Sequence, residues 1–206
     1  MSIVSRSFTC PSCGAPIEHT FPGARSLVCN YCGQTSHLNA DDLEAAGDKH
    51  LLIDYGSVFE IGQRGAFQEK SFTVLGRIRL AYDGGFWDEW FVQFDDLKEG
   101  WIQEDDGQFV MFQKVKDLQT SLKVHHLKVG QWTTFEDQYE KTFITHTSSA
   151  TVQGGEGQLP FRIIPGEPAD FADGILKGRP VSVELLPDEQ ALFVGVPFRL
   201  DQISLN

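Results

Sequence analysis

All four cysteines of the chain lie within its first 32 residues, in two Cys-x-x-Cys pairs. Cys10 and Cys13 form the first pair, and Cys29 and Cys32 form the second about fifteen residues further along, a spacing typical of four-cysteine zinc sites. Tetrahedral Zn²⁺ binds four thiolates at about 2.3 Å, and four protein ligands leave no position for water. The motif therefore predicts one structural Zn²⁺ ion held by these four residues.

Paired cysteines have two other common uses, and both fit this chain less well. Cysteines two residues apart in a turn are poor partners for a disulfide. The chain also begins Met-Ser-Ile-Val, without an apolar signal segment, so we expect a cytoplasmic protein whose thiols stay reduced. A redox Cys-x-x-Cys motif normally occurs once, beside a β-α-β pattern that this sequence lacks.

The charge of the chain is negative and unevenly distributed. The net charge is −12, yet residues 1–40 carry only Arg6 and Arg25 against Glu18. Nucleic-acid binding needs a basic stripe that neutralises phosphates, so we expect this chain to bind neither nucleic acid nor an anionic membrane surface. No apolar run approaches the roughly 18 residues of a membrane span, which argues against direct membrane insertion. A protein partner is the expected alternative.

Alternating apolar and polar residues predict strands along most of the chain. Between 72 and 82, apolar residues alternate with Thr73, Arg77 and Arg79, which is the period-two pattern of a half-buried strand. No long segment has helical periodicity, so we expect an all-β protein with an antiparallel barrel or sandwich after the ribbon. The predicted strands are 72–82, 86–94, 101–102, 109–115, 122–126, 131–135, 140–146, 150–153, 161–164, 180–186, 192–196 and 198–205.

The order of these signals predicts four regions. They are a zinc ribbon at 1–40, a linker at 41–56, a first β half at 57–118 and a second β half at 119–206. The linker begins with an acidic, glycine-ended stretch at 41–47 that predicts a short helical turn. The similar stretches 59–63 and 127–131 suggest that the two halves are related. The glycine-rich stretch 154–157 predicts a mobile loop, because no helix and no adjacent lysine accompany it as in a phosphate-binding loop.

Tryptophans and carboxylates gather in the first β half. A groove built from them would stack and neutralise a cation such as a polyamine or a lysine-rich peptide. The same residue types also suit a tryptophan-rich sheet core with solvated carboxylates at its turns, which is the favoured interpretation because half-buried strands prefer aromatic residues. The residues of this candidate ligand face are Trp87, Asp88, Glu89, Trp90, Trp101, Glu104 and Asp105.

Catalytic chemistry has little support in the sequence. His125, His126 and His146 lie in predicted strands, without the converging ligands of a catalytic metal site. Ser148 and Ser149 lack the strand–turn–helix context of a nucleophile elbow. We therefore expect a protein without enzymatic activity.

Several segments resemble a bacterial family known as domain of unknown function 4178. Residues 10–18 and 28–33 are similar to its N-terminal ribbon, residues 85–90 and 100–105 to its aromatic and acidic motif, and residues 155–161 and 169–171 to its second-half signature. The resemblance implies a non-enzymatic protein that occurs near membrane-stress proteins of the phage-shock type and near polyamine-synthase-like proteins. It thus implies an adaptor in a cytoplasmic, membrane-proximal assembly.

Two functions are predicted on these grounds. The first is a protein-interaction adaptor whose ribbon docks on a partner. For this ribbon we expect that substitution of Cys29 unfolds it while the β body stays folded. The second is a binder or sensor of a cationic small ligand, such as a polyamine, through the acidic and aromatic face.

Overall fold

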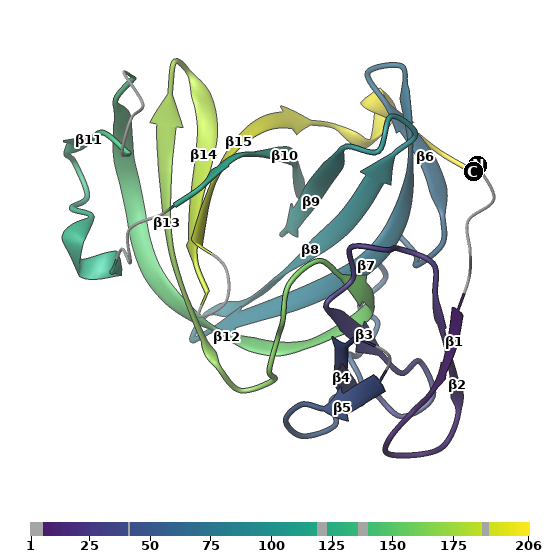
Figure 1. Ribbon diagram of the computed structural model, residues 1–206. Coiled ribbons are helices and arrows are strands. Elements are labelled where there is room, and N and C mark those ends of the chain that lie inside the picture. The colour runs from purple at the N-terminus through teal and green to yellow at the C-terminus, as the bar shows by residue number, and fades with distance from the viewer. Residues whose placement is uncertain (1–5, 41, 119–122, 136–139, 187–189) are drawn as a thin grey trace.

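Strands account for almost all of the regular structure. The computed structural model describes residues 6–40, 42–118, 123–135, 140–186 and 190–206, and the helical elements in these ranges are the short 3₁₀ turns η1 (Val124–His126) and η2 (Leu200–Gln202). The all-β prediction is thereby confirmed (Figure 1). The strands are β1 (Arg6–Thr9), β2 (Pro16–His19), β3 (Ser26–Val28), β4 (Thr35–Asn39), β5 (Asp42–Ala45), β6 (Arg64–Phe67), β7 (Lys70–Tyr82), β8 (Gly85–Phe94), β9 (Glu99–Asp105), β10 (Gln108–Asp117), β11 (Trp132–Thr133), β12 (Thr142–Leu159), β13 (Pro168–Leu176), β14 (Arg179–Leu185), β15 (Gln190–Phe198) and β16 (Ile203–Leu205).

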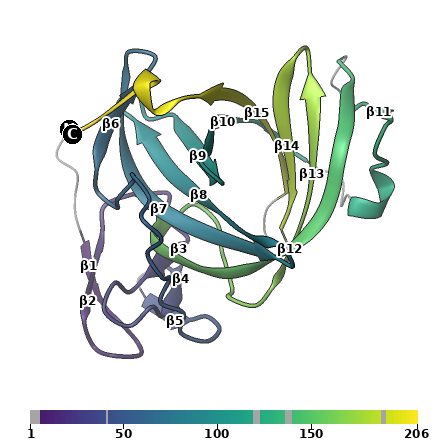
Figure 2. The same ribbon diagram turned by 180° about the vertical axis from the view of Figure 1, so that it is seen from behind.

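Eight of these strands form a closed antiparallel barrel. Their order is β7-β8-β9-β10-β15-β14-β13-β12, and β12 pairs back onto β7. The barrel consists of two four-stranded meanders, β7–β10 and β12–β15, which join at the pairs β10–β15 and β7–β12. Figures 1 and 2 show the blue and teal first meander beside the green and yellow second one.

The glycine-rich stretch 154–157 lies in the seam that closes the barrel. Gly157 of β12 is paired with Gly76 of β7. A Cβ on Gly76 would lie 2.3 Å from the carbonyl oxygen of Gln158, and a Cβ on Gly157 would lie 2.3 Å from that of Leu75. The prediction of a mobile loop is therefore wrong: the glycines allow two backbones to approach closely along a paired strand.

The segments 59–67 and 127–135 fold in the same way at the start of the two halves. In the first segment, the N–H of Gly62 donates to the carbonyl oxygen of Val74, and the N–H of Val74 donates to that of Gln63. The second segment repeats both bonds with residues 130, 144 and 131. The side chains at 59 and 67, and those at the matching positions 127 and 135, are all buried. The sequence similarity between 59–63 and 127–131 thus has a structural counterpart.

Alternate side chains of the barrel strands enter different hydrophobic clusters. The central cluster fills the barrel, where the rings of Trp87 on β8 and Phe171 on β13 lie 5.1 Å apart although these strands are not neighbours. Trp90 and Val92 of β8 face outward into a second cluster, to which β6 contributes Phe67. A third cluster joins the outer side of β14 and β15 to the 127–135 segment.

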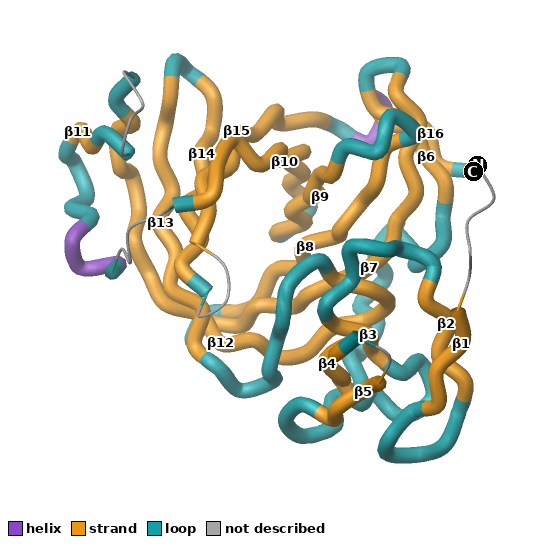
Figure 3. The backbone as a smooth tube through the Cα atoms, in the orientation of Figure 1, coloured by secondary structure: helices purple, strands orange, loops and turns teal. Residues whose placement is uncertain are grey.

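The ribbon is continuous with the barrel in sheet pairing and in core. β3 pairs with β4 and β4 with β5, while Leu27 of β3 also pairs with Gln158 of β12. Phe21 of the ribbon packs on Phe91 of the central cluster, with ring centroids 5.1 Å apart. The tube in Figure 3 shows β3 and β4 beside the β7 and β12 side of the barrel.

Several local predictions differ from the structure. Residues 42–45, predicted as part of a helical turn, form β5, because β4 supplies a pairing edge that local propensity does not reveal. The described part of the predicted strand 122–126 forms η1, and residue 122 lies outside the described ranges. Residues 161–164 form no strand, although Phe161 and Ile163 are buried in the central cluster. β13 was missed, because its glycine, proline and aspartates conceal the alternation.

Candidate functional site

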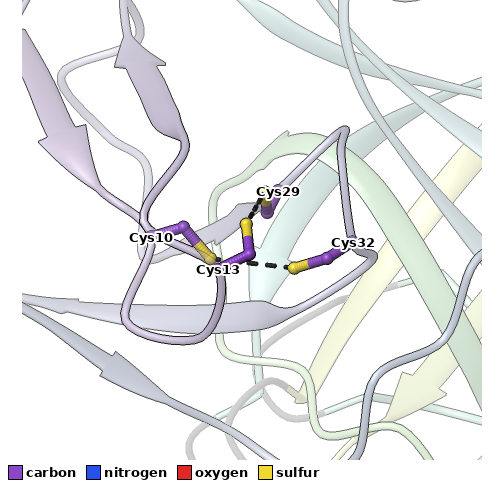
Figure 4. Close-up of side chains that lie close together, drawn as sticks. All are labelled: Cys10, Cys13, Cys29 and Cys32. Atoms are coloured by element: carbon purple, nitrogen blue, oxygen red, sulfur yellow. Dashed lines mark hydrogen bonds between the residues drawn. The ribbon is translucent and has the colours of Figure 1, made fainter.

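The four cysteines converge on one point between two turns. Their sulfur atoms all lie within 4.8 Å of one another, with 3.8 Å between the Sγ atoms of Cys10 and Cys32 and 3.7 Å between those of Cys13 and Cys29 (Figure 4). A tetrahedron with metal–sulfur bonds of about 2.3 Å has edges of about 3.8 Å. A disulfide would need an S–S distance of about 2.05 Å, and all four cysteines are free. The four cysteines therefore fit a tetrahedral metal ion.

The two cysteine turns have the same backbone geometry. The N–H of Gly14 donates to the carbonyl oxygen of Cys10, and the N–H of Gly33 donates to that of Cys29. Both glycines have positive φ, 76° and 68°. Gly33 is further restricted because a Cβ there would lie 2.5 Å from the carbonyl oxygen of His50. Glycine is therefore the residue that both turns require.

Burial and backbone hydrogen bonds set the pKa values of Cys10 and Cys29 apart when no metal is bound. Burial raises the pKa of Cys29 to about 12, with neighbouring thiols adding to the effect. Burial acts in the same direction on Cys10, but backbone N–H donors of Cys13 and Ser12 outweigh it and lower its pKa to about 7. Four thiolates so close together need a compensating cation. A bound metal ion would supply that charge, and these cysteines would hold it as a structural centre without an open ligand position.

A cleft of about 410 Å³ lies where the ribbon meets the barrel. The ribbon contributes Ile17, Glu18 and Val28, and β12 contributes Glu156 and other residues of the seam. The segment 50–52, which leads from the ribbon toward the barrel, forms a further wall. The N–H of His50 donates to the carbonyl oxygen of Gly33, so this wall is attached to the second cysteine turn.

The residues of the predicted ligand face are divided between the two sides of the sheet. Trp87, Glu89 and Trp101 lie inside the barrel, and the indole N–H of Trp87 donates to Glu89 at 2.8 Å. Trp90 lies outside in the second cluster, beside Asp88 and Glu104, whose carboxylate accepts from its indole N–H at 2.9 Å. All three tryptophans and both Asp88 and Glu89 are buried. The period of two along β8 and β9 accounts for this division.

A buried ion-pair network on the outer side of β7 and β8 was missed by the sequence analysis. Arg79 donates to both carboxylate oxygens of Asp88 at 2.8 and 2.6 Å, and to the carbonyl oxygen of Ile53. Arg77 lies 3.6 Å from Asp88 and 2.9 Å from Glu156 of β12. The sequence feature that could have indicated this network is the spacing of Arg77 and Arg79, two residues apart in a largely apolar strand. This spacing places both side chains on one face of the strand.

A second, more polar pocket of about 510 Å³ lies beside this network. Its lining combines three aromatic residues with four carboxylates and one arginine. The guanidinium of Arg79 lies 4.1 Å from the ring centroid of Phe86 and 5.0 Å from that of Tyr55, so a cation already stacks on these walls. Burial, and then the neighbouring Asp106, raise the pKa of Asp105. The aromatic and charged lining residues are Tyr55, Tyr82, Phe86, Arg79, Asp88, Glu104, Asp105 and Asp106.

The barrel interior also contains carboxylates but has little free space. A cavity of about 20 Å³ lies among Trp87, Glu89, Gln103, Phe171 and Asp173, which is room for about one water molecule. Burial raises the pKa of Asp173 to about 6, while His146 acts against this shift and Asp105 adds to it.

The predicted histidines do not meet in one site. The rings of His125 and His126 contact each other on η1, where both are exposed, and His146 lies on β12 near Asp173. Within the described residues, the four cysteines are the cluster of metal-ligating side chains. Among the helices of the described residues, none is long and apolar enough to cross a membrane.

Comparison with known proteins places the barrel in a family. The sequence model of the family described as "Domain of unknown function (DUF4178)" matches residues 60–184, which extend from the 59–67 segment into β14 and exclude the ribbon. No curated protein and no solved structure matches the chain.

Proposed function

The chain belongs to the DUF4178 family, and from this premise we propose that it is a non-enzymatic, cytoplasmic protein-interaction adaptor whose ribbon and barrel together form the docking cleft. The observation that carries this proposal is the cleft of about 410 Å³ with walls from both parts. We also propose that the adaptor works in a membrane-proximal assembly, as the family resemblance implies. The sequence alone predicted docking through the ribbon, whereas the proposed surface is the junction between ribbon and barrel.

An exposed apolar stripe leads away from this cleft. Leu51, Ile53 and Tyr55 are 67%, 65% and 64% exposed, and they alternate along an extended segment that belongs to no strand. Apolar residues gathered in this way on a soluble surface usually mark an interaction site. Glu18 and Glu156 line the cleft, and the whole chain carries a net charge of −12. The partner chemistry that fits is an extended peptide with apolar side chains and lysine or arginine.

A peptide-display selection on the full-length, metal-loaded protein tests the adaptor proposal. We expect enrichment of peptides with apolar and basic residues on the wild type, and their binding should fall by about tenfold or more in Leu51→Asp/Ile53→Asp, because two apolar contacts are lost. Leu97→Asp is the matched control, since Leu97 is 72% exposed in the turn between β8 and β9. Equal binding by the double variant and the control would reject the cleft as the docking site.

We further propose that the metal of the four-cysteine centre is Zn²⁺, one ion per chain, with a structural role. Four sulfur donors at tetrahedral separations support this assignment. Metal analysis of the purified chain should give one zinc per protein. Cys13→Ser should lower that ratio, while Ser12→Ala should leave it unchanged. Iron or a two-metal stoichiometry would contradict the assignment.

The polar pocket beside Arg79 favours a second candidate function, the binding of a small organic cation such as a polyamine. Four carboxylates face a single arginine there, and the aromatic walls already stack one guanidinium. Titration calorimetry with spermidine should detect binding that weakens in Asp105→Asn/Asp106→Asn. Asp48→Asn, which lies outside the pocket, provides the control. No heat of binding in the wild type would remove this candidate.

A further inference from the structure

A small pocket of about 130 Å³ lies on the outer side of the barrel, at the β10–β15 pair where the two meanders join. Met111 of β10 is paired with Val196 of β15, and Gln113 with Val194. Residues paired directly across strands share one face of a sheet, so these four side chains lie together on the outer face. This β10–β15 pocket shares no described lining residue with the ribbon–barrel cleft or with the polar pocket beside Arg79.

The inner part of its lining is apolar. Met111 is 2% exposed and belongs with Phe67 and Phe94 to the second cluster. Val196 packs against that cluster, and Val194 belongs to the third. The volume of about 130 Å³ corresponds to about four water molecules in the liquid. Because burial of apolar atoms is favourable, the pocket suits the short apolar chain of a small molecule.

The outer part of the lining carries two cations and two amides, all of them exposed. Lys70 begins β7 of the first meander, and Arg179 begins β14 of the second. The Nε of Arg179 donates to the carbonyl oxygen of Gly195 at 3.3 Å, which attaches the side chain to β15. Gln68 and Gln113 supply the amides. Figures 1 and 2 show the β6–β7 and β13–β14 turns, which precede the two cations, at the same end of the barrel.

The charge of the pocket is opposite to the net charge of −12 of the whole chain. None of its described lining residues is acidic, and neither Lys70 nor Arg179 forms an ion pair with a described residue. Glu69 precedes Lys70 in the turn and is exposed, and it still leaves one positive charge in excess when it is counted with the two cations. Glu99 precedes Gly100, whose Cβ would lie 3.3 Å from Met111, so Glu99 faces the other side of the sheet.

Four other carboxylates on the surrounding segments are each paired with a basic side chain, so they do not cancel this excess. The pairs are Asp95 with Arg64, Asp96 with Lys98, Asp117 with Lys114, and Glu140 with Lys177.

We propose that the β10–β15 pocket binds a short-chain carboxylate, whose carboxylate group is held by Lys70 and Arg179 and whose apolar chain lies against Met111. Arginine binds carboxylates through two parallel N–H donors, and lysine adds a second positive charge. The apolar inner lining favours an organic anion over an inorganic one. This site goes beyond the adaptor cleft, which lies at the other join of the meanders, β7–β12. A ligand held by both cations would connect the two meanders.

The methyl group of Met111 provides a direct measurement. The chain contains two methionines, Met1 and Met111, so ¹³C-methyl labelling gives two NMR signals, and Met111→Leu identifies the signal of the pocket by its loss. Butyrate added to the full-length, metal-loaded protein should shift this signal until the pocket is saturated. Butyramide has a similar chain without the charge, and butylamine has the opposite charge. Both should bind about tenfold or more weakly than butyrate.

Substitution of the two cations tests their role. Lys70→Gln and Arg179→Gln each remove one charge and keep a polar side chain, and each should weaken butyrate binding by about fivefold or more, because a charge-assisted hydrogen bond is lost. The double variant should show no saturable shift. Lys98→Gln and Arg199→Gln are the matched controls, since both residues are exposed cations outside the pocket, and they should bind like the wild type. Thermal melting verifies that each variant is folded.

The possible results decide whether the pocket is a carboxylate site. No saturable shift with butyrate, equal binding of butyramide, or unchanged binding in the double variant would overturn the proposal. Inorganic phosphate that binds as tightly as butyrate would also overturn it and would assign the pocket to anions in general. Leu51→Asp/Ile53→Asp should leave the Met111 response unchanged, so failure at the cleft and failure at this pocket are distinguishable.

Discussion

Asp88 lies between two arginine side chains on the outer side of the barrel. It is 4% exposed, forms a bidentate pair with Arg79 and lies 3.6 Å from Arg77. Arg79 also donates a hydrogen bond to the carbonyl oxygen of Ile53. The network is thereby attached to the segment 51–55, which carries the exposed apolar stripe. A sequence indicates arginines on one face of a strand, but their partner depends on the register between β7 and β8, which is not a local property.

Removal of this carboxylate should destabilise the protein strongly. Asp88→Ala leaves two buried guanidinium groups without their shared counter-charge, and we expect the free energy of unfolding to fall by about 3–5 kcal/mol. Urea denaturation followed by far-UV circular dichroism measures this change. Asp95→Ala is the control: its pair with Arg64 has side chains 60% and 56% exposed, and its loss should cost about 1 kcal/mol or less. Similar losses for the two variants would contradict a buried network.

Asp173 inside the barrel should make stability depend on pH. Its pKa is raised from 3.8 to about 6, first by burial and further by Asp105, with His146 acting in the opposite direction. The folded state thus favours the protonated carboxyl. Its contribution to stability is complete below the unfolded-state pKa and is lost as the pH rises through about 6. Above that pH the ionised carboxylate opposes folding.

Asp173→Asn should therefore stabilise the protein at neutral and alkaline pH. At about pH 8 we expect a gain in the free energy of unfolding of up to about 3 kcal/mol relative to the wild type, and at about pH 4 little or no gain. Urea titrations of both proteins across this range measure the difference. A difference that does not change with pH would show that Asp173 has no raised pKa in the folded protein.

At the scale of elements, local patterns predicted strands well where apolar and aromatic residues are dense. β7, β8 and β10 were predicted close to their observed bounds, although their apolar side chains enter two different clusters. β5 was predicted as a helical turn because Asp42, Leu43, Glu44 and Ala45 resemble the start of a helix, and pairing with β4 overrides that preference. The central part of β12 was predicted as a loop because glycine is uncommon in strands.

The glycines of the barrel seam should tolerate no side chain. Gly76→Ala would place a Cβ 2.3 Å from the carbonyl oxygen of Gln158 and 2.9 Å from a methyl group of Leu159. The strands β7 and β12 must separate to accept it, and we expect a loss of about 1–3 kcal/mol in the free energy of unfolding. Gly85→Ala is the control, because the nearest atom to its Cβ is 3.4 Å away. Equal stability of Gly76→Ala and Gly85→Ala would contradict the close approach at the seam.

At the scale of the whole molecule, the sequence predicted the parts but not how they join. The four cysteines identify the ribbon because their spacing is local, and the two β halves follow from repeated strand signals. Closure of the barrel depends on β7 pairing with β12, between residues 70 to 81 positions apart, and no local pattern encodes that contact. The ribbon also shares its core with the barrel, since Phe21, Leu27 and Cys29 belong to the same cluster as Phe91 and Trp101.

This shared core changes what loss of the metal should do. The sequence alone predicts that the ribbon unfolds by itself, whereas the structure makes us expect the barrel to be destabilised as well. Removing the proposed metal with a strong chelator would take away the binding energy that it contributes to folding the ribbon. The barrel then loses the packing of Phe21 and Leu27 against its central cluster, and its melting temperature should fall by about 5–10 °C.

Calorimetry and tryptophan fluorescence on the full chain measure this coupling. Trp101 reports on the barrel because its ring lies 5.0 Å from that of Phe91, which the ribbon covers. Cys29→Ser should lower the melting temperature as the chelator does, and Ser12→Ala in the same ribbon should not. Added Zn²⁺ should restore the melting temperature of the chelated wild type but not that of Cys29→Ser. If the melting temperature of the barrel does not change when the metal is removed, the ribbon folds as a separable unit. The cleft between ribbon and barrel would then not be held together by a shared core.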